Sequence, residues 1–196
     1  MPEYTKQEDD ALYPPDLPLT AGEVALIKGI FGDEINTDIV KKYYSAKEKP
    51  GDPGNVIPAQ TFSKDSVKFY GPQYILEDYS KTNNIFNFGS FFHEITHIWQ
   101  NQNDIPNKSS RRDYQYKLTP QSSFDDFGWE QQARMIENYA RQCLHPSSRI
   151  LQADPLLQKV VEDRFPEAKK TRAALQKQRR TVPKVRRPKV GQLYLF

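Results

Sequence analysis

The chain has few of the residues that mark a disulfide-bonded or membrane-embedded protein. Its 196 residues include one cysteine, Cys143, which excludes an internal disulfide. It has no run of about 18 apolar residues, so a membrane span is not expected. Residues 1–10 are acidic and polar, unlike a secretory signal peptide. We therefore expect a protein that is cytoplasmic as synthesised, and any export must use a route without a cleaved signal.

Positive charge is concentrated at one end of the chain. Beyond Phe165 there are ten Lys or Arg residues and one acidic residue, whereas the whole chain has 28 basic and 25 acidic residues. The first 165 residues therefore have a net charge of about −6 and the remainder about +9. We expect an extended leader at 1–18, a single domain at 19–165 and a basic tail at 166–196, either flexible or partner-binding.

The basic tail raises the possibility of nucleic-acid binding. Such a charge would neutralise phosphates in a salt-dependent way. However, no aromatic residues are interleaved with the charges before Tyr194. A solvated segment, or one that docks on an acidic surface, is the commoner explanation of such a run. Nucleic acid is therefore not an expected partner.

Residue patterns predict strands mainly before residue 80 and helices after it. Thr20-Ala21-Gly22-Glu23 has the capping-box pattern, and Gly32 should end the helix that follows. A second short helix is expected at about 36–44. Further segments are expected as strands at 56–57, 66–70 and 74–76 and as helices at 87–102, 127–144 and 155–165. This order predicts an α+β fold, with a small antiparallel sheet before the central helix and a helical C-terminal half.

Two of the three histidines lie in an otherwise apolar stretch and have the spacing H-E-x-x-H. On a helix, His93 and His97 share one face and can bind a single zinc ion together. Glu94 is rotated off that face, where it can take a proton from a metal-bound water. The alternative is that both histidines are hydrogen-bonded core residues. Burying them with a glutamate is costly unless a partner satisfies them, and a metal does so. The pattern therefore predicts a zinc hydrolase.

A catalytic zinc needs a third protein ligand. Glu130 and Glu137 are seven residues apart on the helix expected at 127–144, at one edge of its apolar stripe. Either carboxylate could point towards the two histidines. The alternative for each is a glutamate that flanks the core and faces water. The residue pattern leaves the choice between them open.

Several sequence blocks resemble one bacterial family. They are Phe92–Gln100, a Tyr-x-Tyr segment at 114–116, and Trp129-Glu130-Gln131-Gln132-Ala133. Together they resemble the HExxH metallopeptidase-like domains encoded beside type VI secretion spike (Vgr) and Rhs-type toxin genes. The segment from Leu19 to Asp33 is similar to the usual start of these domains, so the resemblance covers about residues 19–145.

The resemblance implies a zincin-like domain over 19–165, with a gluzincin-like site. His93, His97 and Glu130 would be the zinc ligands and Glu94 the general base. Many gluzincins place an acid four residues after the ligand glutamate, and this acid supports a zinc histidine. Arg134 stands there and cannot accept a hydrogen bond. Support is therefore expected from elsewhere, with Glu137 and Asn138 as candidates.

The implied activity is zinc-dependent cleavage of an amide bond by a type VI secretion effector or toxin. The substrate would be a polypeptide or a peptidoglycan peptide, and a Vgr or Rhs spike or an immunity protein would be a partner. Tyr114, Tyr116 and His145 are candidates for stabilising the oxyanion, and Tyr116 is our predicted catalytic residue. The segment 66–70 could align an extended peptide by edge pairing, or it could be a packed interior strand. The alternative function is a secretion-associated adaptor whose zinc is mainly structural.

Overall fold

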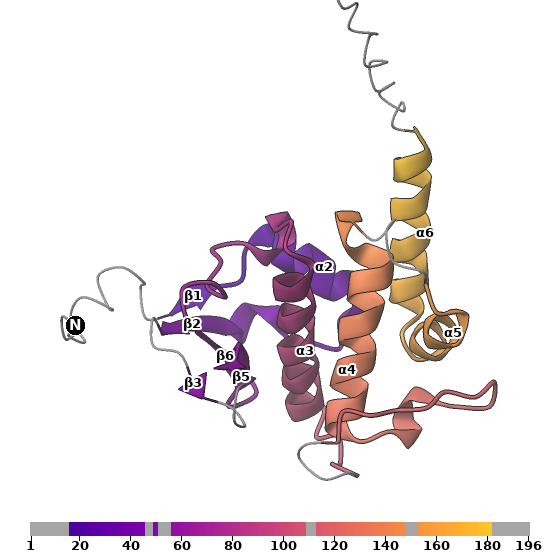
Figure 1. Cartoon of the computed structure of the whole chain (residues 1–196), viewed down its shortest axis with the longest axis horizontal. Coiled ribbons are helices and arrows are strands. Elements are labelled where there is room, and N and C mark those ends of the chain that lie inside the picture. Colours follow the sequence, from indigo (N-terminus) through magenta and orange to yellow (C-terminus); the bar gives the residue numbers. More distant parts are fainter. Residues whose placement is uncertain (1–15, 46–48, 51–55, 109–112, 148–152, 182–196) are drawn as a thin grey trace, which may run out of the picture.

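A computed structural model describes residues 16–45, 49–50, 56–108, 113–147 and 153–181. A small sheet lies on one side of the central helix α3 (Ile85–Gln102), and the remaining helices lie mostly on the other (Figure 1). This arrangement confirms the predicted α+β class. Most of the expected leader, 1–15, and the end of the basic tail, 182–196, lie outside the described residues. Within the described ranges, no helix combines the length and apolar character needed to cross a bilayer.

The first helix, α2 (Ala21–Phe31), begins as the capping box predicts. The backbone N–H of Glu23 donates to the Thr20 hydroxyl, and the Thr20 N–H donates to the Glu23 carboxylate. Gly32 ends the helix with a positive φ of 61°, which a residue without Cβ adopts at little cost. The Glu23 side chain is fully buried. It therefore has a structural role besides the cap.

The main sheet contains β1 (Leu17–Pro18), β2 (Lys41–Ser45), β6 (Ser66–Tyr70) and β5 (Ala59–Thr61), in that spatial order. The prediction of an antiparallel sheet is wrong in one pairing, because β2 and β6 run parallel. The physical reason is the β5–β6 hairpin, which reverses the chain at the sheet edge and returns β6 in the direction of β2. A separate two-stranded ribbon joins β3 (Lys49–Pro50) and β4 (Val56–Ile57).

Two other local predictions are wrong. Instead of a helix at 36–44, a single 3-10 turn (Thr37–Ile39) leads directly into β2. Tyr43 and Tyr44 favour strands, and pairing with β6 satisfies their backbone groups. The predicted strand at 74–76 is irregular and precedes a second 3-10 turn, Tyr79–Lys81. Apolar residues alone did not indicate whether a neighbouring strand was available.

Helix α3 lies at the centre of the core. It packs against α4 (Trp129–Tyr139), which continues as a π-helical turn (Ala140–Leu144). The helices α5 (Pro155–Arg164) and α6 (Pro166–Thr181) complete the helical side. The Trp99 ring of α3 lies 5.3 Å from that of Phe165 and 6.1 Å from that of Phe31, centroid to centroid. The C-terminal half of α3 is thus fixed by aromatic packing.

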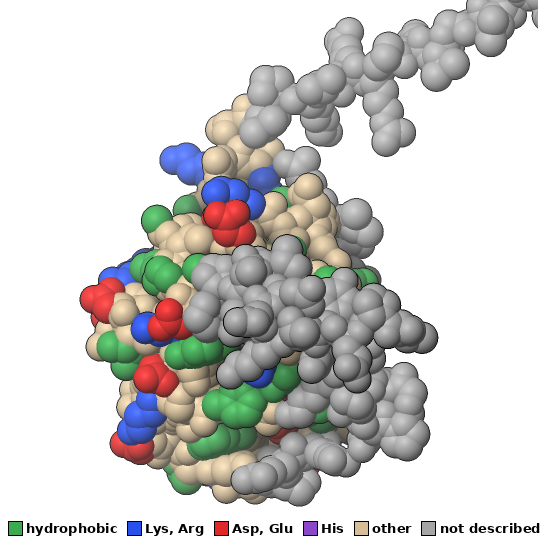
Figure 2. Space-filling model, turned by 90° about the vertical axis from the view of Figure 1, so that its left-hand side faces the viewer, with side chains coloured by type: hydrophobic (Ala, Val, Ile, Leu, Met, Phe, Trp, Pro, Cys, Tyr) green, Lys and Arg blue, Asp and Glu red, His purple; other side chains and the backbone are tan. Residues whose placement is uncertain are grey.

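The first half of the basic segment is part of the folded body. Helix α6 packs along α2, and Ala168 is fully buried. Arg172 pairs with the carboxylate of Glu162, and Arg179 donates to the backbone carbonyls of Leu144 and His145. On the sheet-side face in Figure 2, Lys and Arg side chains lie among Asp and Glu side chains rather than in one continuous patch.

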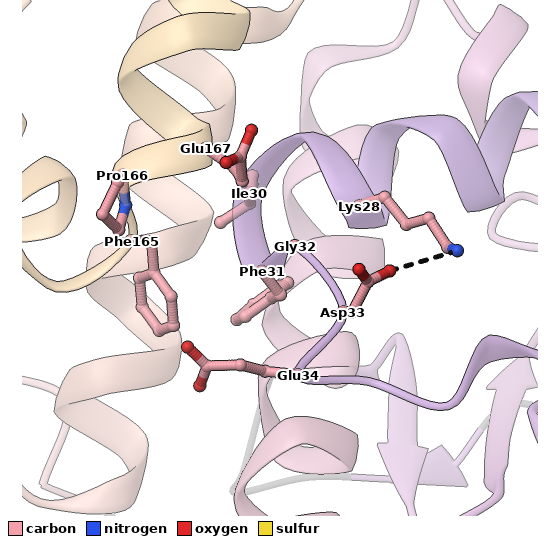
Figure 3. Close-up of a pocket in the computed structure, with 9 residues that line it drawn as sticks. All are labelled: Lys28, Ile30, Phe31, Gly32, Asp33, Glu34, Phe165, Pro166 and Glu167. Carbon is pink, nitrogen blue, oxygen red and sulfur yellow. Dashed lines mark ion pairs between the residues drawn. The ribbon is translucent and has the colours of Figure 1, made fainter.

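A hollow of about 410 Å³ lies where the end of α2 meets the α5–α6 corner (Figure 3). The Phe31 and Phe165 rings contribute to its apolar lining, and Lys28 and Asp33 form an ion pair of 3.3 Å on its opposite side. None of its lining residues belongs to the histidine motif.

Candidate metal centre

Three predicted ligand residues meet where α3 packs against α4. His93 and His97 lie one turn apart on α3, and Glu130 is in the first turn of α4. The Glu130 Oε2 atom lies 3.2 Å from His93 Nε2 and 3.3 Å from His97 Nε2. The ligand atoms of all three residues lie within 4.8 Å of one another. Their side chains are 13%, 13% and 18% exposed, so the cluster remains accessible.

The other ring nitrogen of each histidine has its own acceptor. His93 Nδ1 lies 3.2 Å from Glu137 Oε2, and His97 Nδ1 lies 2.7 Å from Gln100 Oε1. A carboxylate can only accept, so the hydrogen bond with Glu137 requires a proton on His93 Nδ1. The Gln100 amide nitrogen donates to the Trp129 carbonyl and to Gln132, which directs its oxygen towards His97. With Nδ1 of each ring directed at an acceptor, Nε2 is the nitrogen that each ring can offer to a metal.

This arrangement fits a bound cation. The two Nε2 atoms and the Glu130 Oε2 atom face one another, and each can donate an electron pair to a metal. Glu130 Oε2 is buried without a hydrogen-bond partner among the described residues. Such an atom is costly to bury unless a positive charge compensates it. Two imidazole nitrogens and one carboxylate oxygen form a donor set that zinc accepts, and the protein ligands leave a fourth position open.

The same geometry perturbs the ionisation of the cluster. Burial opposes the charge of Glu130, but the two imidazoles outweigh burial and hold the pKa of Glu130 at about 2. Burial also disfavours protonation of His93. The carboxylates of Glu130 and Glu137 overcome that effect and raise the pKa of His93 to about 9. In the absence of a metal, the cluster therefore takes up a proton as its cation.

Glu137 occupies the supporting position that Arg134 cannot fill. Burial alone would raise the pKa of Glu137, but the hydrogen bond with His93 and the charges of Arg141 and Arg134 lower it. Arg134 and Arg141 approach its carboxylate at 2.9 Å and 2.6 Å. The residue that interrupts the gluzincin pattern thus helps to hold the carboxylate that supports His93.

Gly89 makes room for this arrangement one turn before His93 on α3. A Cβ atom at position 89 would lie 2.0 Å from Arg141 Nε. We expect Gly89→Ala to destabilise the fold by about 1–3 kcal/mol, because Arg141 must move from a packed position. Urea unfolding of the two proteins measures this difference. Gly29→Ala, whose Cβ would lie 3.0 Å from Thr171 Oγ1, is the milder control. Equal stability of Gly89→Ala and the unmodified chain would contradict the packing argument.

Glu94 lies beside the cluster and is 7% exposed. Its Oε2 atom lies 2.8 Å from the hydroxyl of Thr61, the last residue of β5. The same hydroxyl lies 2.9 Å from the Glu94 backbone carbonyl oxygen. The predicted base is therefore tied to the sheet edge as well as carried by the motif helix.

The three oxyanion candidates lie in different surroundings. The Tyr116 hydroxyl accepts a hydrogen bond of 2.8 Å from the Asn138 amide. The Tyr114 ring lies 6.0 Å from the His93 ring and 5.5 Å from the Arg134 guanidinium carbon. His145 is fully buried against Phe88, and its Nε2 faces the Thr82 carbonyl. Tyr114 thus borders the metal centre, whereas His145 packs one turn or more away along α3.

Sequence reasoning assigned no role to Gln100 or Thr61. Gln100 is three residues after His97, so its position on the same helix face was a usable signal. Thr61 is 33 residues from Glu94 in sequence, and nothing in the motif identifies it.

The residues therefore define a two-histidine, one-glutamate site that could hold a metal on an α+β fold. No protein-family model matches the sequence. Over 139 residues the chain is 28% identical to the type VI secretion system spike protein VgrG2b of Pseudomonas aeruginosa. This match covers 62% of the chain but only 12% of VgrG2b, so the chain is similar to a small part of that protein. The match agrees with the predicted resemblance to Vgr-related sequences.

A solved structure is also similar to the chain. It is the effector domain of Pseudomonas aeruginosa VgrG2b, with 20% sequence identity and a TM-score of 0.48. The alignment covers 79% of this chain and 84% of that domain.

Proposed function

We propose that this chain is a zinc-dependent amide hydrolase that acts as a type VI secretion effector. One observation carries the proposal: His93 Nε2, His97 Nε2 and Glu130 Oε2 converge within 4.8 Å of one another, with the outer side of each ring bonded to an acceptor. Two imidazole nitrogens and one carboxylate oxygen that converge on one point form a donor set that zinc accepts. The similarity to VgrG2b supports the secretion context.

His93, His97 and Glu130 would hold the metal, with Glu137 and Gln100 orienting the rings. When bound, zinc supplies a Lewis acid that polarises a carbonyl and acidifies water. Glu94 would accept the proton of the attacking water and deliver it to the leaving amine. Tyr116 is the predicted oxyanion donor. Tyr114 is a second candidate, and its ring lies 6.0 Å from that of His93.

The sheet suggests how an extended substrate would bind. Residues 66–70 form β6, which lies between β2 and β5. This segment is therefore an interior strand and not an edge that could receive a peptide. The edge strand of the described sheet on the α3 side is β5, which contacts α3 and ends at Thr61. We propose that β5 pairs with the backbone of a polypeptide or a peptidoglycan peptide.

Zinc content and cleavage test the proposal together. We expect the purified chain to bind about one zinc ion and to cleave labelled casein or peptidoglycan peptides. Chelation should abolish cleavage, and added zinc should restore it. A chain that binds no zinc when zinc is supplied would refute the proposal.

A second candidate function is a secretion-associated adaptor with a mainly structural zinc. It is favoured by the similarity to a spike protein, VgrG2b, rather than to a free-standing enzyme. An adaptor would bind zinc and unfold on chelation but cleave neither substrate. It would also copurify with a Vgr or Rhs spike protein, and copurification without cleavage would favour this function over hydrolysis.

A further inference from the structure

We infer that Thr61 is a positioning residue for Glu94, an inference that rests on the proposed hydrolase function. Thr61 lies at the end of β5, and its hydroxyl is within hydrogen-bond distance of the Glu94 carboxylate. The contact links β5, the strand proposed to bind substrate, with Glu94, the proposed general base. It therefore links two parts of the site that are 33 residues apart in sequence.

The backbone on both sides of this contact is well fixed. In the β5–β6 hairpin, Thr61 pairs with Val67, which is 1% exposed. Threonine is branched at Cβ, so its hydroxyl has few orientations on a strand. Glu94 lies in the middle of α3, beside the buried Ile95. The hydroxyl position is thus determined by the hairpin, and it does not depend on substrate.

The Glu94 side chain needs such a restraint. A glutamate has three rotatable bonds, and its carboxylate can otherwise turn towards the two imidazoles. The Thr61 hydroxyl lies 2.8 Å from Oε2 and 2.9 Å from the Glu94 carbonyl oxygen, so it contacts side chain and backbone together. With Oε2 held there, we assign the other oxygen, Oε1, to proton transfer. A base held in place loses less entropy on reaching the transition state.

Kinetics of two Thr61 variants of the full chain test the assignment. Thr61→Val keeps the shape of the side chain but has no hydroxyl. We expect its kcat on labelled casein to fall about 10- to 100-fold, as for the loss of a hydrogen bond to a charged group. The KM, zinc content and melting temperature should change little. Thr61→Ser should recover most of the rate, because it restores the donor. An unchanged kcat in Thr61→Val would overturn the inference. A fall in kcat that Thr61→Ser does not reverse, and that is accompanied by a lower melting temperature, would also overturn it, because it would indicate a purely structural role.

A crystal structure of each variant provides a readout that does not depend on activity. In Thr61→Val the Glu94 carboxylate should leave its position beside residue 61, and in Thr61→Ser it should return. An unmoved carboxylate in Thr61→Val would overturn the inference even if the hydrolase function holds. If the Glu94 carboxylate moves in Thr61→Val but the unmodified chain cleaves no substrate, Thr61 still positions Glu94 and the hydrolase function is refuted instead. The two failures are therefore distinguishable.

Discussion

Replacement of Glu94 by glutamine is expected to reduce hydrolysis about 10²- to 10⁴-fold, the usual contribution of a general base. Glutamine has nearly the same shape as glutamate but cannot take up a proton at neutral pH. Its amide oxygen can still accept from the Thr61 hydroxyl, which lies 2.8 Å from Glu94 Oε2. The loss would therefore report proton transfer rather than a displaced side chain. The measurements are the cleavage rate of labelled casein and the zinc content of the same preparation.

The zinc content should stay near one ion per chain, because the three converging ligand atoms belong to other residues. Glu167→Gln is a matched control, since Glu167 is 44% exposed on α6 and lies outside the cluster. It should retain full activity. If Glu94→Gln were as active as the unmodified chain, Glu94 would not be the base and the hydrolytic mechanism proposed here would fail.

Local signals in the sequence were sufficient to predict α2 and the motif helix. The capping box at Thr20 and Glu23 needs residues only three apart, and the structure contains both of its hydrogen bonds. His93 and His97 share a helix face for the same reason, because four residues make about one turn. Each pattern involves residues close in sequence, so the rest of the fold does not alter it.

The assignment of the two glutamates depended on how two helices cross. Glu130 and Glu137 lie on one edge of α4, and sequence spacing does not distinguish them. In the structure Glu130 faces the Nε2 atoms of both histidines, whereas Glu137 faces His93 Nδ1. One carboxylate thus meets the inner side of the histidine pair and the other its outer side. Only the relative position of α3 and α4 determines this difference.

Local sequence patterns also could not predict the direction of β6 or the hydrogen-bond partner of Glu94, because both depend on contacts between residues far apart in the sequence. The parallel β2–β6 pairing depends on a hairpin at the sheet edge, and periodicity does not encode strand direction.

The burial of Lys42 was also not predicted from the sequence. In a strand that reads Lys-Lys-Tyr-Tyr-Ser, one lysine is 49% exposed and its neighbour is almost completely buried. Alternation along the strand separates them, and only a buried acid makes the second position tolerable.

Lys42 and Glu23 form that buried pair, and its disruption should cause a large loss of stability. The Lys42 ammonium lies 2.9 Å from both Glu23 oxygens and donates to the Glu77 carbonyl, with side chains 1% and 0% exposed. We expect Lys42→Met to lower the free energy of unfolding by about 3–5 kcal/mol, because Glu23 is left buried without its cation. Urea unfolding followed by circular dichroism measures this quantity.

Two further variants separate the buried charge from general effects of losing a lysine. Lys41→Met removes a half-exposed ion pair with Asp16 and should leave the free energy of unfolding almost unchanged, because water screens such a pair. Glu23→Gln combined with Lys42→Met should recover part of the lost stability, because a neutral amide needs no cation. Recovery should be incomplete, because the backbone N–H groups of Thr20 and Tyr79 bond to different Glu23 oxygens in the native chain, and the single amide oxygen of glutamine replaces one of them. Equal losses in Lys41→Met and Lys42→Met, or a double variant less stable than Lys42→Met alone, would show that the uncompensated charge of Glu23 is not the cause.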